Sequence, residues 1–126
     1  MHELSLAIAI IDQASEMLAQ HNATSPRQSV IAVHVRIGTL TGVVPAALGA
    51  AFTFAREGTA LHACTLVVQP VPATCRCPCS ADPQPVDSPR HLVCAACGRE
   101  ATVITGGREL EVFALELRDE PHHAPC

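Results

Sequence analysis

A chain of 126 residues has room for one domain and a small appendage. Hydrophobic residues make up 48% of it, which is enough for a core, but aromatic residues make up only 2%, so the core must consist of Leu, Ile, Val and Ala. The formal net charge is −4 and lysine is absent, which argues against a surface that binds phosphate or nucleic acid.

Two further absences bear on where the protein acts. No apolar run reaches the length of a membrane span. Residues 1–20 lack the basic start and the small-residue cleavage site of a signal peptide. We therefore expect a soluble cytoplasmic protein whose thiols stay reduced.

The first predicted element is a helix over residues 4–21, because apolar residues recur there at spacings of three and four. Its main stripe consists of Leu4, Ala7, Ile8, Ile11, Ala14 and Leu18, and the residues that widen it are Leu6, Ile10 and Met17. A helix with so wide an apolar face should be buried on more than one side.

A strand is predicted next, over residues 29–37, because β-branched residues alternate there. The residues expected to face the core are Ile31, Val33, Val35 and Ile37, and those expected to face outward are Ala32, His34 and Arg36. A second helix should begin at Pro45 and stop at Gly58, and a second short strand should cover residues 64–69.

The segment from Pro70 to Pro89 has a different composition, since it holds six of the ten prolines. Proline removes a backbone donor and fixes φ, so no regular ladder or helix is expected there. A loop of this length needs something to tie it down, and a metal held at both ends would do so. Beyond it, we predict a brief strand over residues 101–104, a turn at Gly106-Gly107 and a long strand over residues 109–118.

Five of the seven cysteines lie between Cys75 and Gly98. Cys94-Ala95-Ala96-Cys97-Gly98 has the spacing of a zinc knuckle, in which two thiolates grip one tetrahedral ion and the glycine supplies a left-handed residue. The upstream cysteines at positions 75, 77 and 79 are less regular. We predict Zn(II) bound by Cys77, Cys79, Cys94 and Cys97, with Cys75 as an alternative ligand.

Disulfides and a redox C-x-x-C are the competing interpretations of these cysteines. A reduced compartment disfavours disulfides, and the spacing rules then favour a metal. A redox motif should open a helix after a strand, whereas Cys94 follows a proline-rich loop. Cys64 is expected to be a small buried residue, and His34 a packed or exposed one.

The start of the chain, Met1-His2-Glu3, offers a second metal site. A methionine before a large residue is expected to be retained, so the amine, the His2 amide and the His2 imidazole would lie within one residue of each other. Three such nitrogens can close fused chelate rings in a plane, which Ni(II) or Cu(II) prefers. Glu3 could complete the shell or accept the imidazole N–H. At the other end, His122, His123 and Cys126 are expected to be disordered, or an auxiliary nickel-holding site.

Together these motifs resemble the HypA/HybF family of nickel metallochaperones, which serve [NiFe]-hydrogenase maturation. The resemblance rests on M-H-E-L-S at the start, an amphipathic helix, V-x-V-R-I-G at Val33–Gly38, the paired cysteines and a terminal strand. It implies a transient Ni(II) site at Met1 and His2 with Glu3 close by, and a structural Zn(II) site at the cysteines. It also implies a HypB-type GTPase as the partner that helps deliver nickel to the hydrogenase large subunit. The first knuckle departs from the family pattern, because it reads C-R-C-P-C rather than C-x-x-C.

We therefore predict an α+β fold in which two helices lie on a small three-stranded sheet with an inserted zinc-ribbon-like subdomain. The predicted parts are a nickel-binding domain (residues 1–69 plus 109–118), a zinc-binding subdomain (70–108) and a flexible tail (119–126). The protein is expected to be a monomer or weak homodimer and not an enzyme, since no Gly-rich phosphate loop is present. The alternative function is a zinc-ribbon module for protein interaction or nucleic-acid binding without nickel transfer.

Overall fold

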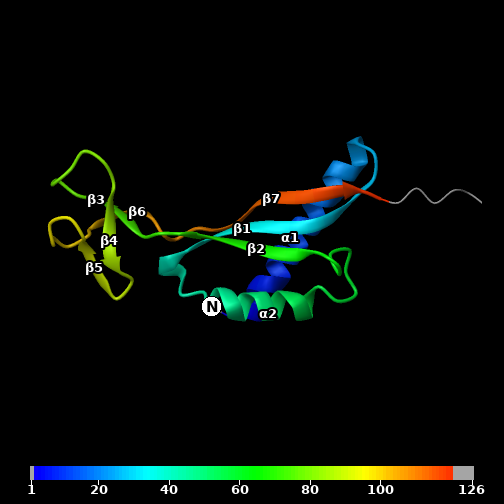
Figure 1. Ribbon diagram of the computed structural model, residues 1–126, viewed down its shortest axis with the longest axis horizontal. Helices are drawn as coiled ribbons and strands as arrows, with labels where there is room; N and C mark the ends of the chain where they lie inside the picture. The colour runs from blue at the N-terminus through cyan, green and yellow to red at the C-terminus, as the bar shows by residue number, and fades with distance from the viewer. Residues whose placement is uncertain (1, 121–126) are drawn as a thin grey trace, which may run out of the picture. The chain divides into compact units, whose positions relative to one another are not determined.

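The computed structural model describes residues 2–120 (Figure 1). Its elements are, in chain order, α1 (Glu3–Thr24), β1 (Gln28–Gly38), the short 3-10 helix η1 (Thr39–Thr41), α2 (Pro45–Ala55), β2 (Thr65–Val71), β3 (Thr74–Arg76), β4 (Gln84–Ser88), β5 (His91–Cys94), β6 (Val103–Gly106) and β7 (Leu110–Asp119). Within this part of the chain, no helix is both long enough and apolar enough to cross a membrane.

The strands form two sheets, and the chain divides into two compact units. One sheet has three strands in the order β2-β1-β7, and the other has four in the order β5-β4-β3-β6. The first unit contains the chain up to Val35, Val44–Val67 and the chain from Val112, and the second contains Arg36–Val43 and Val68–Glu111. The predicted α+β class is confirmed. The predicted assignment of one metal to each part stays a prediction.

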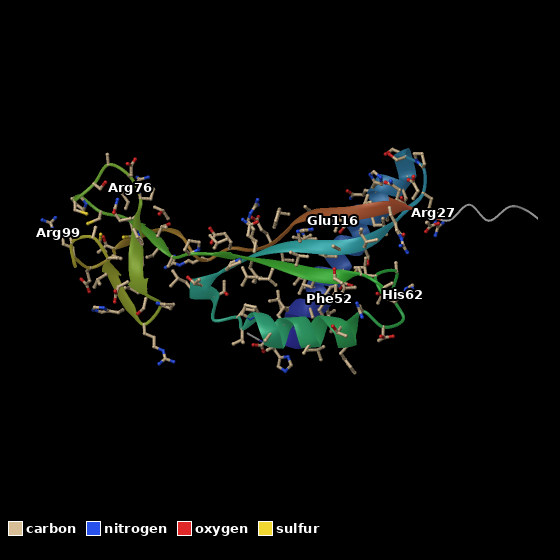
Figure 2. All side chains as sticks on the ribbon, in the orientation of Figure 1. Arg27, Phe52, His62, Arg76, Arg99 and Glu116 are labelled. Atoms are coloured by element: carbon tan, nitrogen blue, oxygen red, sulfur yellow. The ribbon has the colours of Figure 1, made fainter. Side chains whose placement is uncertain are left out.

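The core of the first unit lies between the two helices and the three-stranded sheet. The buried residues of α1 keep the three-four spacing: Leu6, Ala7, Ile10, Ile11, Ala14 and Leu18. Ile8, expected in this stripe, is 48% exposed instead, because the buried face of the helix is turned toward Leu6 and Ile10. Leu48 and Phe52 of α2 are buried as well, and Phe52 lies on the side of α2 that faces the sheet (Figure 2).

The alternation of β1 differs from the prediction at its first half. Val33, Val35 and Ile37 are buried as expected, but Ile31 is exposed. Ala32 and Val33 are buried in succession, so the alternation shifts by one residue between them. A shift of this kind moves every earlier side chain to the opposite face of the strand.

The proline-rich segment of the second unit is more regular than predicted. It contains β3 and β4, and the expectation that no ladder forms there is wrong. The strands are short, and Pro85 sits within β4 opposite Thr74 while its carbonyl accepts the Ala95 N–H at 2.9 Å. Pro85 thus contributes an acceptor where it cannot contribute a donor.

A close crossing of two backbones also belongs to the second unit. The Gly38 N–H donates to the Glu109 carbonyl at 2.8 Å, and the Leu40 N–H donates to the Gly107 carbonyl at 2.7 Å. A Cβ atom added to Gly38 would collide with the carbonyl of Gly107. Gly38, the glycine that ends the V-x-V-R-I-G motif, is therefore required because another backbone segment approaches it closely.

Candidate metal centre

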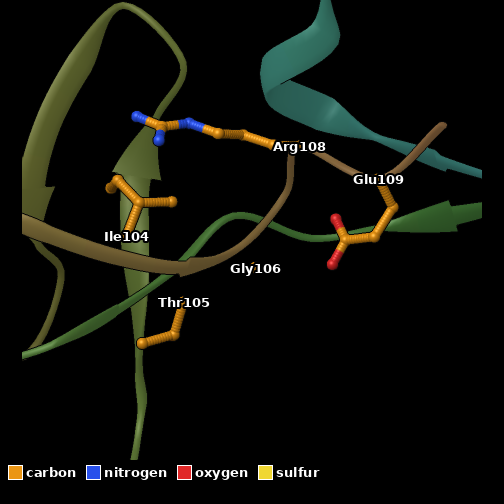
Figure 3. Close-up of a pocket in the computed structure, with 5 residues that line it drawn as sticks. All are labelled: Ile104, Thr105, Gly106, Arg108 and Glu109. Carbon is orange, nitrogen blue, oxygen red and sulfur yellow. The ribbon is translucent and has the colours of Figure 1, made fainter.

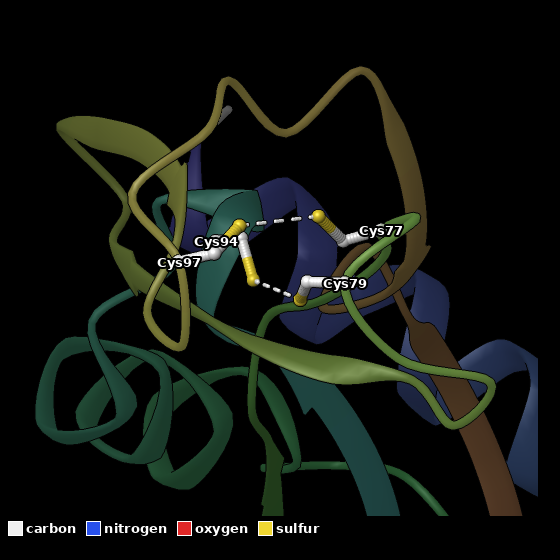
Figure 4. A group of neighbouring side chains, drawn as sticks. All are labelled: Cys77, Cys79, Cys94 and Cys97. Carbon is white, nitrogen blue, oxygen red and sulfur yellow. Dashed lines mark hydrogen bonds between the residues drawn. The ribbon is translucent and has the colours of Figure 1, made fainter.

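Four cysteine sulfurs meet at one point in the second unit (Figure 4). Cys77 and Cys79 follow β3, Cys94 ends β5 and Cys97 lies in the next turn. The Sγ atoms all lie within 4.8 Å of one another. The Cys77 and Cys97 sulfurs are 3.4 Å apart and those of Cys79 and Cys94 are 3.7 Å apart, so each close pair joins the two knuckles.

The second knuckle has the backbone geometry that its sequence predicts. Gly98 adopts φ +77°, the left-handed conformation that glycine tolerates best. Its N–H donates to the Cys94 carbonyl at 2.8 Å, and the Cys94 N–H donates to the Arg99 carbonyl at 2.7 Å. The turn therefore holds Cys94 and Cys97 on the same side of the chain.

Strand β4 joins the two knuckles, which the sequence did not reveal. It pairs with β3 through Cys75 opposite Gln84, and with β5 through Val86 opposite Cys94. Backbone pairing on both sides fixes the distance between the two knuckles. The prolines made this segment of the sequence resemble a loop, so its pattern did not indicate a strand.

The proton affinities of two of these thiols move in opposite directions. Burial alone would raise the pKa of Cys94, but hydrogen bonds from the backbone N–H groups of Cys97 and Ala96 outweigh it and lower the pKa to about 7. Cys79 shares hydrogen bonds with Cys77 and Cys94, and together with burial these raise its pKa to about 12. Without a cation, this packing therefore favours the thiolate form of Cys94 and the protonated form of Cys79.

Cys75 lies outside the group of four sulfurs. It is fully buried in the core of the second unit, whose buried residues are Ala73, Cys75, Cys77, Val86 and Cys94. Burial raises the pKa of the Cys75 thiol, and so does the neighbouring Cys94. Cys64, in the first unit, is also buried, as predicted. All six cysteines of the described chain are free thiols.

The donor set fits a zinc ion. A tetrahedral site with Zn–S bonds of about 2.3 Å places its sulfurs about 3.8 Å apart. The close sulfur pairs, at 3.4 and 3.7 Å, lie near that value, so little rearrangement would be needed to admit the ion. Four thiolates without an open position form a closed site, which suits a structural rather than a catalytic ion.

The predicted nickel residues lie at the start of α1. Met1 falls outside the described residues, as do His122, His123 and Cys126. His2 is exposed, occupies the N-cap position without a capping hydrogen bond from its side chain, and accepts the Leu6 N–H at 3.1 Å through its carbonyl. Glu3 is half-buried in the first turn.

In the described part of the chain, no other group of three or more His, Cys, Asp or Glu side chains is arranged to hold a metal ion. His34 pairs through Nε2 with Glu116, and its ring meets that of Phe113 edge-on at 6.0 Å between centroids. A cavity of about 290 Å³ at the β6–β7 connection is lined by five residues, among which only Glu109 carries a common metal-ligating group (Figure 3). That carboxylate already accepts the Gly107 N–H at 2.7 Å.

The sequence of this chain is similar to that of known proteins along nearly its whole length. The family model described as hydrogenase/urease nickel incorporation, metallochaperone, hypA matches residues 1–117. A hydrogenase maturation factor HypA from Chloroflexus aggregans is 41% identical over 116 residues, which cover 92% of this chain and 98% of that protein. The HypA of Streptomyces avermitilis is 36% identical over 124 residues, which cover 98% of this chain and 92% of that protein.

Solved structures show the same fold at lower identity. The solution structure of a HypA protein has a TM-score of 0.63 at 23% identity, covering 95% of this chain and 98% of that one. That of the Ni metallochaperone HypA from Helicobacter pylori has a TM-score of 0.56 at 21% identity, covering 95% and 100%. The family model and the curated relatives carry the assignment: this chain belongs to the HypA family of nickel-incorporation metallochaperones, which are maturation factors rather than enzymes.

Proposed function

We propose that this protein carries Ni(II) at its N-terminus and helps insert it into the large subunit of a [NiFe]-hydrogenase. The observation that carries the proposal is the family match, which begins at residue 1 and includes Met1-His2-Glu3. The ligands are the Met1 amine, the His2 amide nitrogen and the His2 imidazole, with Glu3 beside them. Four-coordinate planar nitrogen sets are preferred by Ni(II).

The position of His2 at a helix start supports this ligand set. The first backbone N–H groups of a helix have no carbonyl partner within the helix, so deprotonating the His2 amide breaks no helical hydrogen bond. The His2 carbonyl, by contrast, is engaged by Leu6, which ties the residue to α1. The partial positive charge of a helix N-terminus opposes a cation, which favours release of the nickel over permanent retention.

A second ion is proposed to have a permanent, structural role. Zn(II) would be held by Cys77, Cys79, Cys94 and Cys97, whose sulfurs already lie within 4.8 Å of one another. Bound zinc would hold the four cysteines as thiolates, because the ligands of a metal must be deprotonated, and its positive charge would offset the raised pKa of Cys79. In this proposal, residues 70–108 form the zinc-binding subdomain, and residues 1–69 with 109–118 form the nickel-binding domain.

The proposed partners follow from the same assignment. A HypB-type GTPase would assist delivery, and the hydrogenase large subunit would receive the nickel. The proposed setting is the cytoplasm, where thiols remain reduced and a thiolate zinc site persists.

The proposal is tested by replacing His2. In untagged protein that begins at Met1, His2→Ala should abolish the tight Ni(II) site measured by equilibrium dialysis, and should leave the zinc content unchanged. His62→Ala, which removes another exposed histidine of the first unit, is the matched control and should bind nickel normally. Nickel-loaded wild type should transfer its metal to a metal-free hydrogenase large subunit, and His2→Ala should not. Undiminished nickel binding by His2→Ala would contradict the proposal.

A further inference from the structure

The three-stranded sheet has two edge strands, and they are protected to different degrees. β7 carries four charged residues, which are Glu111, Glu116, Arg118 and Asp119. β2 carries no charged residue in Thr65–Val71, and its only blocking residue is Pro70, next to its end. Edge strands expose unpaired N–H and C=O groups that can pair with another chain, and charges normally discourage such pairing. The β2 edge lacks that safeguard.

A cavity lies between the edge strand β2 and α2. It measures about 400 Å³ and is lined by Gly49, Phe52, Thr53 and Arg56 from α2 and its C-cap, and by Thr65 and Leu66 from β2. In Figure 1, α2 runs along the β2 side of the sheet. A side chain added at Gly49 would meet open space, so the helix leaves room next to the strand. We call this space the α2–β2 groove.

The groove has a single charge, and that charge is unbalanced. α2 itself contains no charged residue, and Arg56 follows its last turn. Arg56 donates through Nη1 to the Cys64 carbonyl, while its Nε is buried without a hydrogen-bond partner. Among the described residues, no ion pair involves Arg56. A half-buried guanidinium without an ion-pair partner is complementary to a carboxylate, which its terminal nitrogens, rather than the buried Nε, can bind through charge-assisted hydrogen bonds.

We propose that the α2–β2 groove binds an extended acidic segment of a partner protein. The segment would add to the β2 edge as a fourth strand and place a carboxylate on Arg56. Main-chain hydrogen bonds to an open sheet edge supply affinity in this mode of recognition, and side-chain pockets supply specificity. A second copy of the chain pairing β2 with β2 could not supply the anion, because β2 has no acidic residue. The groove shares no lining residue with either proposed metal site.

The test uses short peptides of about six residues, the usual length of a strand, in which Val and Thr alternate and one Glu occupies each position in turn. Binding to the full-length protein is followed by nuclear magnetic resonance. For at least one Glu position, the backbone amide signals of Thr65, Leu66 and Val67 should shift and their hydrogen exchange should slow. Replacing that Glu by Gln should weaken binding roughly tenfold, the effect of one charge-assisted hydrogen bond.

Two variants of the groove test separately the charge of Arg56 and the open space next to Gly49. Arg56→Gln should weaken the Glu peptide about tenfold and leave the Gln peptide unaffected. Gly49→Leu should block both peptides by filling the groove, and because it points into open space it should leave the fold intact. The matched controls are Arg90→Gln, on the other unit, and Ala47→Leu, at an exposed position of α2 outside the groove. Both controls should bind like wild type.

Three results would overturn the proposal. The first is the absence of any shift at the β2 amides across the whole peptide panel. The second is equal affinity of wild type and Arg56→Gln for the Glu peptide. The third is concentration-dependent self-association of the free protein that Gly49→Leu abolishes, which would assign the groove to a second copy of this chain.

Discussion

Three cysteines in alternate positions, Cys75, Cys77 and Cys79, have different surroundings in this protein. Cys75 lies within β3 and points into the apolar core with Ala73 and Val86. Cys77 follows the strand and Cys79 lies in the turn, and their sulfurs reach those of the second knuckle. The spacing alone could not separate ligand from core residue, because the distinction depends on where β3 ends.

Zinc content should separate these roles. Cys77→Ala should lose the ion, since three thiolates leave the tetrahedral site open. Cys75→Ala, which removes a sulfur two positions away, should retain one zinc per chain. The zinc content of both variants is measured by elemental analysis after extensive dialysis. Loss of zinc from Cys75→Ala with retention in Cys77→Ala would exchange the two roles.

The proposed role of the Met1 amine as a nickel ligand can be tested by extending the chain. An extension of a few residues before Met1 turns its amine into an amide, which is a poorer ligand and cannot close the same chelate ring. Loss of a direct ligand should cost at least the roughly 10–100-fold in affinity that outer partners of metal ligands contribute. Nickel affinity is measured by competition with a chelator. Protease removal of the extension, leaving Met1 first, should restore binding; an extended protein that binds as tightly as the native one would exclude the amine.

Among the helices, strands and turns, the sequence predicted those whose formation depends on residues close together in the chain. The spacing of apolar residues located α1, and the glycine after Cys97 predicted the left-handed turn at Gly98. The strands β3, β4 and β5 were not anticipated, because they are short and their pairing depends on partners distant in sequence. The displaced alternation at Ala32 has the same origin, since no local residue signals it.

Two glycines give a matched test of close backbone approach. At Gly38, alanine would collide with the Gly107 carbonyl, and we expect a loss of about 1–3 kcal/mol in unfolding free energy. At Gly49, alanine meets open space within a helix, and we expect a gain of roughly 0.5–1 kcal/mol. Urea denaturation measures the free energy of unfolding of both variants. Equal effects of the two substitutions would show that the crossing at Gly38 is loose.

At the scale of the whole molecule, the two units differ in what stabilises them. The first has a core of two helices against a sheet. The buried cluster of the second unit consists of Ala73, Cys75, Cys77, Val86 and Cys94, and so small a cluster, largely of cysteines, supplies little folding energy. A metal bound by thiolates can supply the remainder, because its binding energy is then folding energy.

Removal of zinc should therefore act on one unit only. After treatment with a strong chelator, the amides of Val86, Cys94 and Gly98, which all donate backbone hydrogen bonds, should lose their protection from hydrogen exchange. The amides of α1 should keep theirs. Re-addition of zinc should restore the protection. Unchanged exchange throughout the second unit in the metal-free protein would show that its fold does not need the ion.

We propose that nitrogen ligands at the start of the chain carry nickel while the sulfur ligands hold a different ion. A titration of zinc-loaded, untagged protein with Ni(II), followed by absorption spectroscopy, tests it most directly. We predict that a d–d band of a square-planar nitrogen complex will grow to saturation while zinc stays bound, and that it will be absent from His2→Ala. A spectrum of thiolate-to-nickel charge-transfer bands, accompanied by zinc release, would contradict the claim.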